Sequence, residues 1–198
     1  MNNEAGSARS DNQAGSADSA DSADSAGSAG SSDSASSAPA VTMLDTPIRV
    51  DYAFTAGEAQ SRFLRGLANG KFLGQRCPVC HKVYVPPRGS CPTDGVMLAE
   101  DVELGNSGTV TTYCVVNVPF QGQAIEIPYI CAQILLDGAN LSFMGLIQEI
   151  PTDQVRMGLR VEAVWKDPSE WGPSMGSVKY FKPNGEPDAD YESYKEYL

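Results

Sequence analysis

The sequence predicts a mainly β protein that joins an amphipathic helix, a small zinc ribbon and a closed five-stranded barrel, followed by an aromatic C-terminal tail. Three observations predict this class. Two short cysteine-containing motifs lie near the middle of the chain, a segment with helical spacing precedes them, and five apolar runs separated by turn residues follow them. No run approaches the roughly 18 apolar residues that a membrane-spanning helix needs, so no membrane contact is expected.

The first 45 residues are expected to form a disordered tail, because residues 5–38 consist almost entirely of Ala, Gly, Ser and Asp. Such a segment buries too little apolar surface to offset the entropy of folding. It contains no apolar run typical of a signal peptide, and the odd count of five cysteines does not suit a disulfide framework. We therefore expect a cytoplasmic protein. The helix and ribbon are placed in residues 46–96, the barrel in 97–166, and in 167–198 an extension that docks on the barrel or on a partner.

Residues 55–69 have the spacing of an amphipathic helix. Thr55 and Glu58 match a capping box, and Asn69-Gly70 is a typical C-terminal stop. The apolar side chains of this segment recur on one side of the helix, at Ala59, Phe63, Leu64 and Leu67.

A C-x-x-C motif and a C-x-x-D motif, separated by ten residues, predict a metal site. Zinc prefers thiolates and accepts a carboxylate oxygen, so the candidate ligands are Cys77, Cys80, Cys91 and Asp94. Short strands are expected at 71–76 and 83–88. Three alternatives stay open. The ribbon can hold its shape by packing alone, Cys77 to His81 can be a haem-attachment motif, or the first motif can be a redox pair. The last two fit poorly, because no export signal and no βαβ pattern accompany the motif.

From residue 97 onward the pattern predicts strands. The β-rich runs between turn signals are 97–104, 108–118, 128–137, 141–147 and 158–165. Asp137-Gly138 predicts a tight hairpin connection, and this strand spacing favours a small closed barrel. Four prolines after residue 166 argue against regular structure before residue 188. Cys114 and Cys131 lie inside apolar runs and are expected to be core residues.

Residues 49–88 carry seven basic and two acidic side chains in a chain whose net charge is −11. A basic segment can attract a phosphate-bearing ligand or an acidic partner, but it is also typical of a solvated helix face. The C-terminal tail is rich in aromatic residues, which either fold back on the barrel or anchor a second protein. The candidate partner contacts from the helix and the tail are Phe63, Leu67, Tyr180, Phe181, Tyr191, Tyr194 and Tyr197.

Residues 50–165 resemble the family called domain of unknown function 35, in which a rubredoxin-like zinc ribbon precedes an OB-fold. The first matching string is FLRGLANGKFLGQRCPVCHKVYVPPRGSCPTD from residue 63. The later match runs from GTVTTYCVVNVP at residue 108 through PYICAQILLDG at 128 and GLI at 145 to MGLRVEAVW at 157. Asp94 stands where the family has a fourth cysteine. The resemblance implies zinc as a cofactor and a non-catalytic accessory subunit. Its partner would be a thiolase-fold aldolase or thiolase acting on acyl-CoA, including steroid side-chain degradation, in a heterotetramer.

The resemblance also directs attention to coenzyme A, whose phosphates suit arginine side chains. The candidate phosphate contacts are Arg62, Arg65, Arg76 and Arg88. No catalytic residue is expected, because His81 is the only histidine and no catalytic motif is present. Two alternatives remain: a partner of a MaoC-like enoyl-CoA hydratase, and an OB-fold nucleic-acid-binding protein. The second is disfavoured because the barrel region is acidic and phosphate backbones require positive charge.

Overall fold

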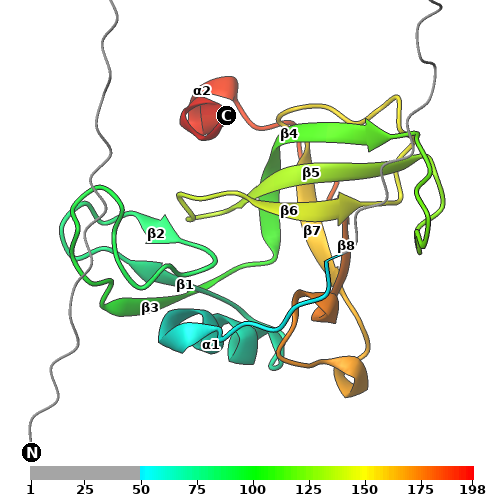
Figure 1. The fold of residues 1–198 in the computed structure, drawn as a ribbon. Coiled ribbons are helices and arrows are strands. Elements are labelled where there is room, and N and C mark those ends of the chain that lie inside the picture. The colour runs from blue at the N-terminus through cyan, green and yellow to red at the C-terminus, as the bar shows by residue number, and fades with distance from the viewer. Residues whose placement is uncertain (1–49) are drawn as a thin grey trace, which may run out of the picture. The chain divides into compact units, whose positions relative to one another are not determined.

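The computed structural model describes residues 50–198. The disordered tail expected for residues 1–45 lies outside the described residues. The described chain forms a helix, a three-stranded sheet and a closed barrel of five strands, in that order (Figure 1). The mainly β class and the order helix, ribbon, barrel are therefore confirmed. None of the helices in residues 50–198 has the length and apolar character needed to cross a bilayer.

The helix α1 (Gly57–Leu67) buries Phe63 and Leu67 and ends close to the predicted stop. The capping box predicted at its start is wrong, because the N-cap residue is Ala56 and no side chain caps the first turn. Glu58 instead accepts a hydrogen bond from Arg62, one turn further along the helix. After the helix, Gly70 has a φ of +68°, and the Trp171 ring lies where a Cβ at this position would be.

The first sheet contains β1 (Phe72–Arg76), β2 (Val83–Tyr84) and β3 (Glu100–Leu104), in the order β2-β1-β3 with both pairs antiparallel. The run at 97–104 was expected to be a barrel strand, and this is wrong. The acidic strand β3 pairs with β1, which follows Lys71 and ends in Arg76. Two cross-strand ion pairs follow from this match, Lys71 with Glu103 at 2.8 Å and Arg76 with Glu100 at 3.2 Å.

The barrel contains β4 (Ser107–Val116), β5 (Tyr129–Leu136), β6 (Phe143–Ile147), β7 (Arg160–Trp165) and β8 (Val178–Pro183). Its strand order is β4-β5-β6-β8-β7, and only the β6–β8 pair is parallel. The closing strand β8 comes from a segment predicted to lack regular structure, so that prediction is wrong. Pro183 is tolerated because it is the last residue of its strand, where a missing N–H costs little.

The predicted hairpin is present, since a turn at Asp137-Gly138 follows β5 and leads to its antiparallel partner β6, but the connection is longer than a tight hairpin and spans residues 137–142. The later connection to β8 contains two short 3₁₀ turns, η1 (Pro168–Glu170) and η2 (Met175–Ser177). The chain ends in one turn of helix, α2 (Tyr191–Tyr194), and the 3₁₀ turn η3 (Lys195–Tyr197). Tyr191, Tyr194 and Tyr197 are three residues apart, and these two helical turns contain all three.

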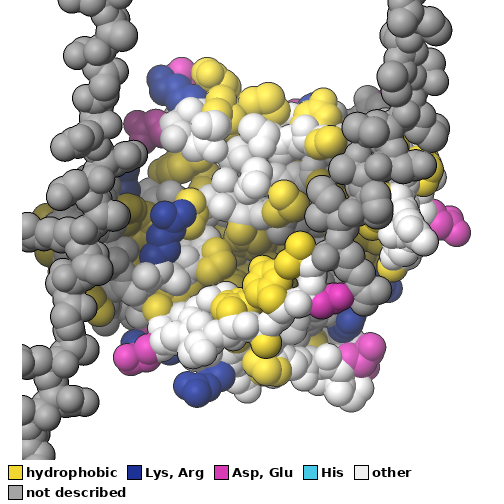
Figure 2. All heavy atoms as spheres, in the orientation of Figure 1, with side chains coloured by type: hydrophobic (Ala, Val, Ile, Leu, Met, Phe, Trp, Pro, Cys, Tyr) yellow, Lys and Arg dark blue, Asp and Glu magenta, His cyan; other side chains and the backbone are white. Residues whose placement is uncertain are grey.

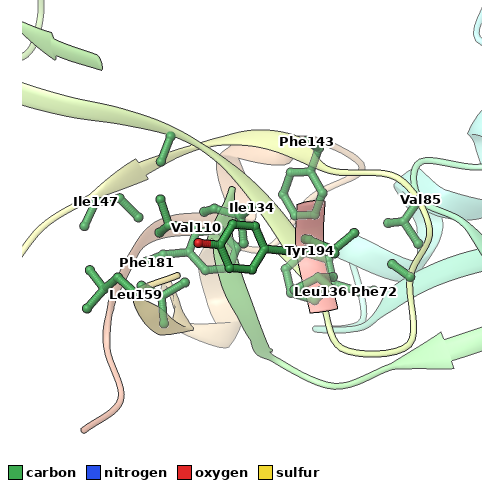
Figure 3. Packing of buried hydrophobic residues seen from close by; sticks show 14 of the residues in the cluster. Phe72, Val85, Val110, Ile134, Leu136, Phe143, Ile147, Leu159, Phe181 and Tyr194 are labelled. Carbon is green, nitrogen blue, oxygen red and sulfur yellow. The ribbon is translucent and has the colours of Figure 1, made fainter. Parts of the chain in front are cut away.

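The ribbon and the barrel share one hydrophobic core. The Phe72 ring of β1 lies 4.9 Å from the Trp165 ring and 6.3 Å from the Phe181 ring, both of which belong to the barrel. Tyr194 of α2 covers the buried side chains at one end of the barrel (Figure 3). The C-terminal tail therefore folds back on the barrel, which was one of its two predicted positions.

Asn140, in the β5–β6 connection, links the ribbon to the tail. Its backbone N–H donates to the Val83 carbonyl at 2.7 Å, and its side-chain oxygen accepts from the Val83 N–H at 2.8 Å. Its side-chain amide nitrogen donates to the Tyr197 hydroxyl at 2.7 Å. One side chain therefore joins β2, the barrel and the C-terminal turn.

Candidate metal centre

The two cysteine-containing motifs have nearly the same backbone conformation. In the first, the His81 N–H donates to the Cys77 carbonyl at 3.1 Å, and in the second the Gly95 N–H donates to the Cys91 carbonyl at 2.9 Å. His81 and Gly95 both have positive φ values, 61° and 67°. Glycine adopts this conformation at little cost, whereas His81 adopts it because the first turn repeats the geometry of the second.

The two turns bring together the four predicted ligands, whose donor atoms all lie within 4.8 Å of one another. The Cys80 and Cys91 sulfurs are 3.7 Å apart, and the nearer Asp94 carboxylate oxygen is 3.2 Å from the Cys91 sulfur. Tetrahedral zinc with ordinary bond lengths requires about 3.8 Å between sulfurs and about 3.5 Å between sulfur and oxygen. The donor set therefore fits zinc in spacing and in chemistry.

The carboxylate of Asp94 is central to the electrostatics of this cluster. Hydrogen bonds from Cys80, then Cys77 and Cys91, lower the pKa of Asp94. A backbone hydrogen bond at Lys82 lowers the pKa of Cys80, but Asp94, burial and the other two thiols outweigh it and raise the pKa to about 11. The Asp94 carboxylate thus accepts hydrogen bonds from the thiols at the position where a cation would contact all four groups.

Tyr84 is a neighbour of the cluster that sequence reasoning missed. It is buried, and its hydroxyl lies 3.5 Å from the Cys91 sulfur. The hydrogen bond to Cys91, together with burial, raises the pKa of Tyr84 to about 12. Successive side chains of a strand point to opposite faces, and in β2 this places Tyr84 on the side of the donor cluster. The strand predicted at 83–88 was therefore the only feature of the sequence that indicated this contact.

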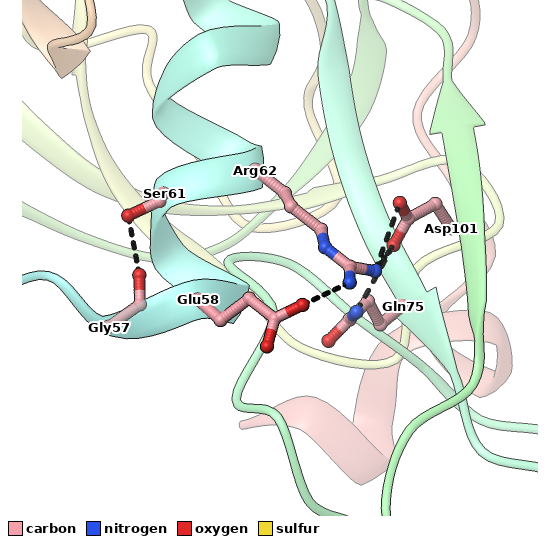
Figure 4. A network of polar contacts seen from close by, with 6 residues as sticks. All are labelled: Gly57, Glu58, Ser61, Arg62, Gln75 and Asp101. Carbon is pink, nitrogen blue, oxygen red and sulfur yellow. Dashed lines mark hydrogen bonds and ion pairs between the residues drawn. The ribbon is translucent and has the colours of Figure 1, made fainter.

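The four candidate arginines do not form one site. Arg62 lies between Glu58 and Asp101, at 2.5 Å and 3.4 Å from their carboxylates (Figure 4). Arg76 pairs with Glu100 at 3.2 Å. Arg62 and Arg88 line one groove beside α1, and Arg62 and Arg65 line a second, shallower depression. Only neighbouring pairs of the four are therefore brought together.

The candidate partner contacts divide by exposure. Phe63, Leu67 and Phe181 are buried in the core of this chain, so the expectation that they contact a partner is corrected. Tyr194 is buried against the barrel in the same way. The remaining three tyrosines have accessible surface: Tyr191 is 54% exposed, Tyr180 is half-buried with its hydroxyl 2.6 Å from Glu149, and Tyr197 is half-buried beside Asn140.

The surface also has apolar groups that were not predicted. The loop between β4 and β5 exposes Val118 and Phe120, at 75% and 61%. Cys114 and Cys131 are opposite one another on β4 and β5, but Cys114 is exposed, so its predicted core position is wrong. On the face that Figure 2 shows, Lys and Arg side chains are scattered, and hydrophobic side chains gather near the middle. No continuous basic track is visible on that face.

Two family models match the chain. The model described as the rubredoxin-like zinc ribbon domain of ChsH2 matches residues 65–96, and the model described as the C-terminal OB-fold domain of ChsH2 matches residues 101–166. The first covers the complete donor cluster. The second ends at the close of β7, so the closing strand β8 lies beyond it.

Two relatives match different shares of their own length. A DUF35 domain-containing scaffold protein of Methanocaldococcus jannaschii is 35% identical over 116 residues, which are 56% of this chain and 80% of the relative. A probable enoyl-CoA hydratase alpha subunit of Thermomonospora curvata is 31% identical over 91 residues, which are 46% of this chain. The chain spans 28% of that second relative.

Two solved structures have a similar fold. One is described as an Ltp2-ChsH2(DUF35) aldolase, with 23% identity and a TM-score of 0.51, covering 64% of this chain and 95% of that chain. The other is a DUF35 protein of unknown function from Sulfolobus solfataricus, with 19% identity, a TM-score of 0.51 and coverage of 65% and 87%. Such identities indicate the fold alone. The family follows from the archaeal scaffold protein, most of whose length this chain matches: the chain belongs to the DUF35 family.

Proposed function

We propose that this chain is a non-catalytic accessory subunit of a thiolase-fold aldolase or thiolase that acts on acyl-CoA, with steroid side-chain degradation as the metabolic setting. The observation that carries this proposal is the match to most of an archaeal protein described as a scaffold. The fold shared with a chain from an aldolase complex is consistent with the same role. The coarser conclusion, an accessory partner subunit, has the stronger support.

The side chains of the described residues support a role without chemistry of its own. His81 is the only histidine, and it is exposed beside the donor cluster. Several carboxylates are held in ion pairs within the chain, such as Asp137 with Arg160 at 2.7 Å, and such pairs belong to the fold. In this proposal the reacting groups belong to the partner enzyme.

We assign Cys77, Cys80, Cys91 and Asp94 to one zinc ion with a structural role. The four donors close the coordination sphere, as in structural rather than catalytic zinc sites. Because the two turns come from separate parts of the ribbon, the ion would add its binding free energy to the stability of this small sheet.

The partner contacts are assigned to exposed rather than buried groups. Tyr191, Tyr180 and Tyr197 remain candidates from the tail, and Val118 and Phe120 are added from the β4–β5 loop. Exposed aromatic and apolar groups of this kind are favoured at interface centres. A heterotetramer, with two copies of each subunit, is the assembly that we propose.

Acyl-CoA is proposed as a ligand of the complex, with phosphate contacts drawn from Arg62, Arg65, Arg76 and Arg88. Arg65 and Arg88 are exposed, and neither has an ion pair to another side chain within residues 50–198. The sequence predicted separate parts at 46–96, 97–166 and 167–198, but strand pairing assigns β3 (Glu100–Leu104) to the ribbon and β8 (Val178–Pro183) to the barrel. The five free thiols are consistent with a cytoplasmic location.

A second candidate is partnership with an enoyl-CoA hydratase of the MaoC type. It is favoured by one specific observation, the 31% identity to part of a protein described as a probable enoyl-CoA hydratase alpha subunit. Both candidates involve an acyl-CoA enzyme, and they differ in the fold of the partner.

Co-expression with the enzymes encoded beside this gene tests the proposal. We expect a thiolase-like enzyme to co-elute with this chain in size exclusion and to lose most of its activity when the chain is omitted. Co-elution with a hydratase alone would select the second candidate. An enzyme that is fully active alone, and a chain that elutes alone, would refute both.

A further inference from the structure

The two cysteines outside the metal centre lie directly opposite one another on neighbouring strands. Cys114 of β4 is in register with Cys131 of β5, and Figure 1 shows these two strands side by side. Ile130 and Ala132, which flank Cys131 in β5, are both buried in the core. Because successive side chains of a strand point to opposite faces, Cys131 points to the outer face of the barrel. Directly opposite residues of an antiparallel pair share a face, so both thiols lie on that outer face.

Both thiols are accessible from outside the core. Cys114 is exposed and Cys131 is half-buried, and neither belongs to a disulfide. Cysteine is among the residue types that are most often buried, and its reactivity more often than its packing decides its role. Packing does not account for Cys114, because an exposed side chain contributes little to the core. The chemistry of the pair is therefore the property that distinguishes this position.

The spacing of the two strands suits a disulfide bond. Directly opposite residues of an antiparallel pair have Cα atoms about 4.5 or 5.5 Å apart, depending on the hydrogen-bonding pattern at that position. A disulfide spans about 4.4–6.8 Å between Cα atoms, so both patterns are compatible with it. The Cβ atoms of opposite residues are about 4.5–5.5 Å apart and would have to approach by about 1 Å.

The end of β4 has the freedom for such a shift. Its pairing with β7 covers only Ser107 to Thr109. Its register with β5 shifts between Val110 and Thr112, which is typical of a β-bulge. Beyond this point β5 is the only strand within residues 50–198 that pairs with β4. The position of Cys114 relative to Cys131 is therefore not fixed by a third strand on the β4 side.

We propose that Cys114 and Cys131 form a modification site, which a low-molecular-weight disulfide such as oxidised glutathione converts reversibly into a cross-strand disulfide. The Cys114 thiolate would attack one sulfur of the small disulfide and displace a thiolate from it. The Cys131 thiolate would then attack the Cys114 sulfur of the mixed disulfide and displace the second thiolate. Two electrons pass from the pair to the small disulfide, and the protons of the two cysteines pass to the released thiolates.

The order of the two steps follows from the exposure and the charge of the thiols. Cys114 is the more accessible of the two and reacts first. Burial raises the pKa of Cys131, and the negative charge of Cys114 raises it further. That charge is lost when Cys114 enters the mixed disulfide, so the Cys131 thiolate forms more readily at the step that requires it.

The disulfide would close the base of the β4–β5 loop. This loop begins after Val116, ends before Tyr129 and exposes Val118 and Phe120. A covalent link near both ends of the loop reduces the number of conformations available to it. The redox state of the pair would therefore set how freely these apolar groups move. The modification is a property of this chain alone and does not depend on the proposed function.

Oxidation of the full chain in glutathione buffers tests the site, with zinc supplied to occupy the metal centre. A protease that cleaves after glutamate separates the cysteines. Cys114 lies in fragment 104–126, Cys131 lies in fragment 127–149, and the three cysteines of the metal centre lie in fragment 59–100. We expect mass spectrometry to find the first two fragments linked and two hydrogen atoms lighter than their sum. An excess of reduced glutathione should separate them again.

Two variants isolate the geometry of the pair. Cys131→Ser should stop at the mixed disulfide, with glutathione retained on the fragment that contains Cys114. The matched control combines Cys131→Ser with Gln133→Cys, which moves the second thiol along the same face to the position opposite Thr112. Diagonal neighbours have Cα atoms about 7–8 Å apart, beyond the usual reach of a disulfide, so linkage should fall by about tenfold.

Three results would overturn the assignment: glutathione retained on Cys114 of the native chain without linkage, linkage to fragment 59–100 instead, or equal linkage in the control variant. The effect on the loop has its own measurement, since the protease should cleave the folded chain at Glu126 about twofold to fivefold more slowly after oxidation. An unchanged rate would overturn that effect. Neither measurement involves a partner enzyme, so their failure would leave the proposed function intact.

Discussion

Replacing Asn140 by alanine should weaken the link between the ribbon and the barrel. We expect it to lower the free energy of unfolding by more than the loss of one ordinary side-chain hydrogen bond would. The Val83 N–H would lose its acceptor, and Val83 is only 1% exposed. An unsatisfied buried backbone donor costs about 1–3 kcal/mol, and the lost bond to Tyr197 adds about 0.5–1.5 kcal/mol. We therefore expect the free energy of unfolding to fall by about 1.5–4.5 kcal/mol.

Urea denaturation followed by the fluorescence of Trp165 and Trp171 measures this change. Tyr197→Phe is the matched control, because it removes only the bond between Asn140 and the tail and should cost about 0.5–1.5 kcal/mol. The difference between the two variants isolates the contact with Val83. The reasoning would be refuted by an Asn140→Ala variant that costs no more than Tyr197→Phe.

Three further predictions concern the metal, the interface and pH. Elemental analysis should find one zinc per chain; Asp94→Cys, which supplies a fourth thiolate, should retain zinc against a chelator longer than the native chain, whereas Asp94→Ala should lose it sooner. Phe120→Ser should change the free energy of unfolding by less than about 0.5 kcal/mol, because the side chain is exposed, yet it should weaken co-elution with the partner enzyme; unchanged co-elution would remove Phe120 from the interface. A hydrogen bond from Arg160 lowers the pKa of Glu186, so its stabilisation is complete above the unfolded pKa of about 4.3 and is lost as pH falls through the lower folded pKa. The difference in urea midpoint between the native chain and Glu186→Gln should therefore be present at neutral pH and vanish in strong acid; a constant difference would contradict the assignment.

The order of the elements and the donor cluster were predictable from local sequence. The ligand spacing, the helical period before it and the β-rich runs after it each depend on residues close together in the chain. The partner of each strand was not predictable in this way. Residues 97–104 read as a strand, but only the charge match to β1 places them in the ribbon sheet, and that match connects residues about thirty positions apart.

The errors in the site have similar physical causes. A segment with four prolines was predicted to lack regular structure, yet it contains β8 because Pro183 falls at a strand end. The aromatic residues of the helix and tail were candidates for a partner interface, since periodicity cannot tell burial within the chain from burial against another protein. Asn140 gave no sequence signal, because its importance comes from contacts with groups distant in the sequence.

The late position of β8 has a consequence for synthesis on the ribosome. The ribbon sheet is complete once residue 104 has emerged, but the barrel lacks one wall until residue 183 follows. During that interval β6 and β7 have open edges, which can pair with other nascent chains. A shortened gene that stops at the end of β7 would make this transient state permanent, and its product should precipitate.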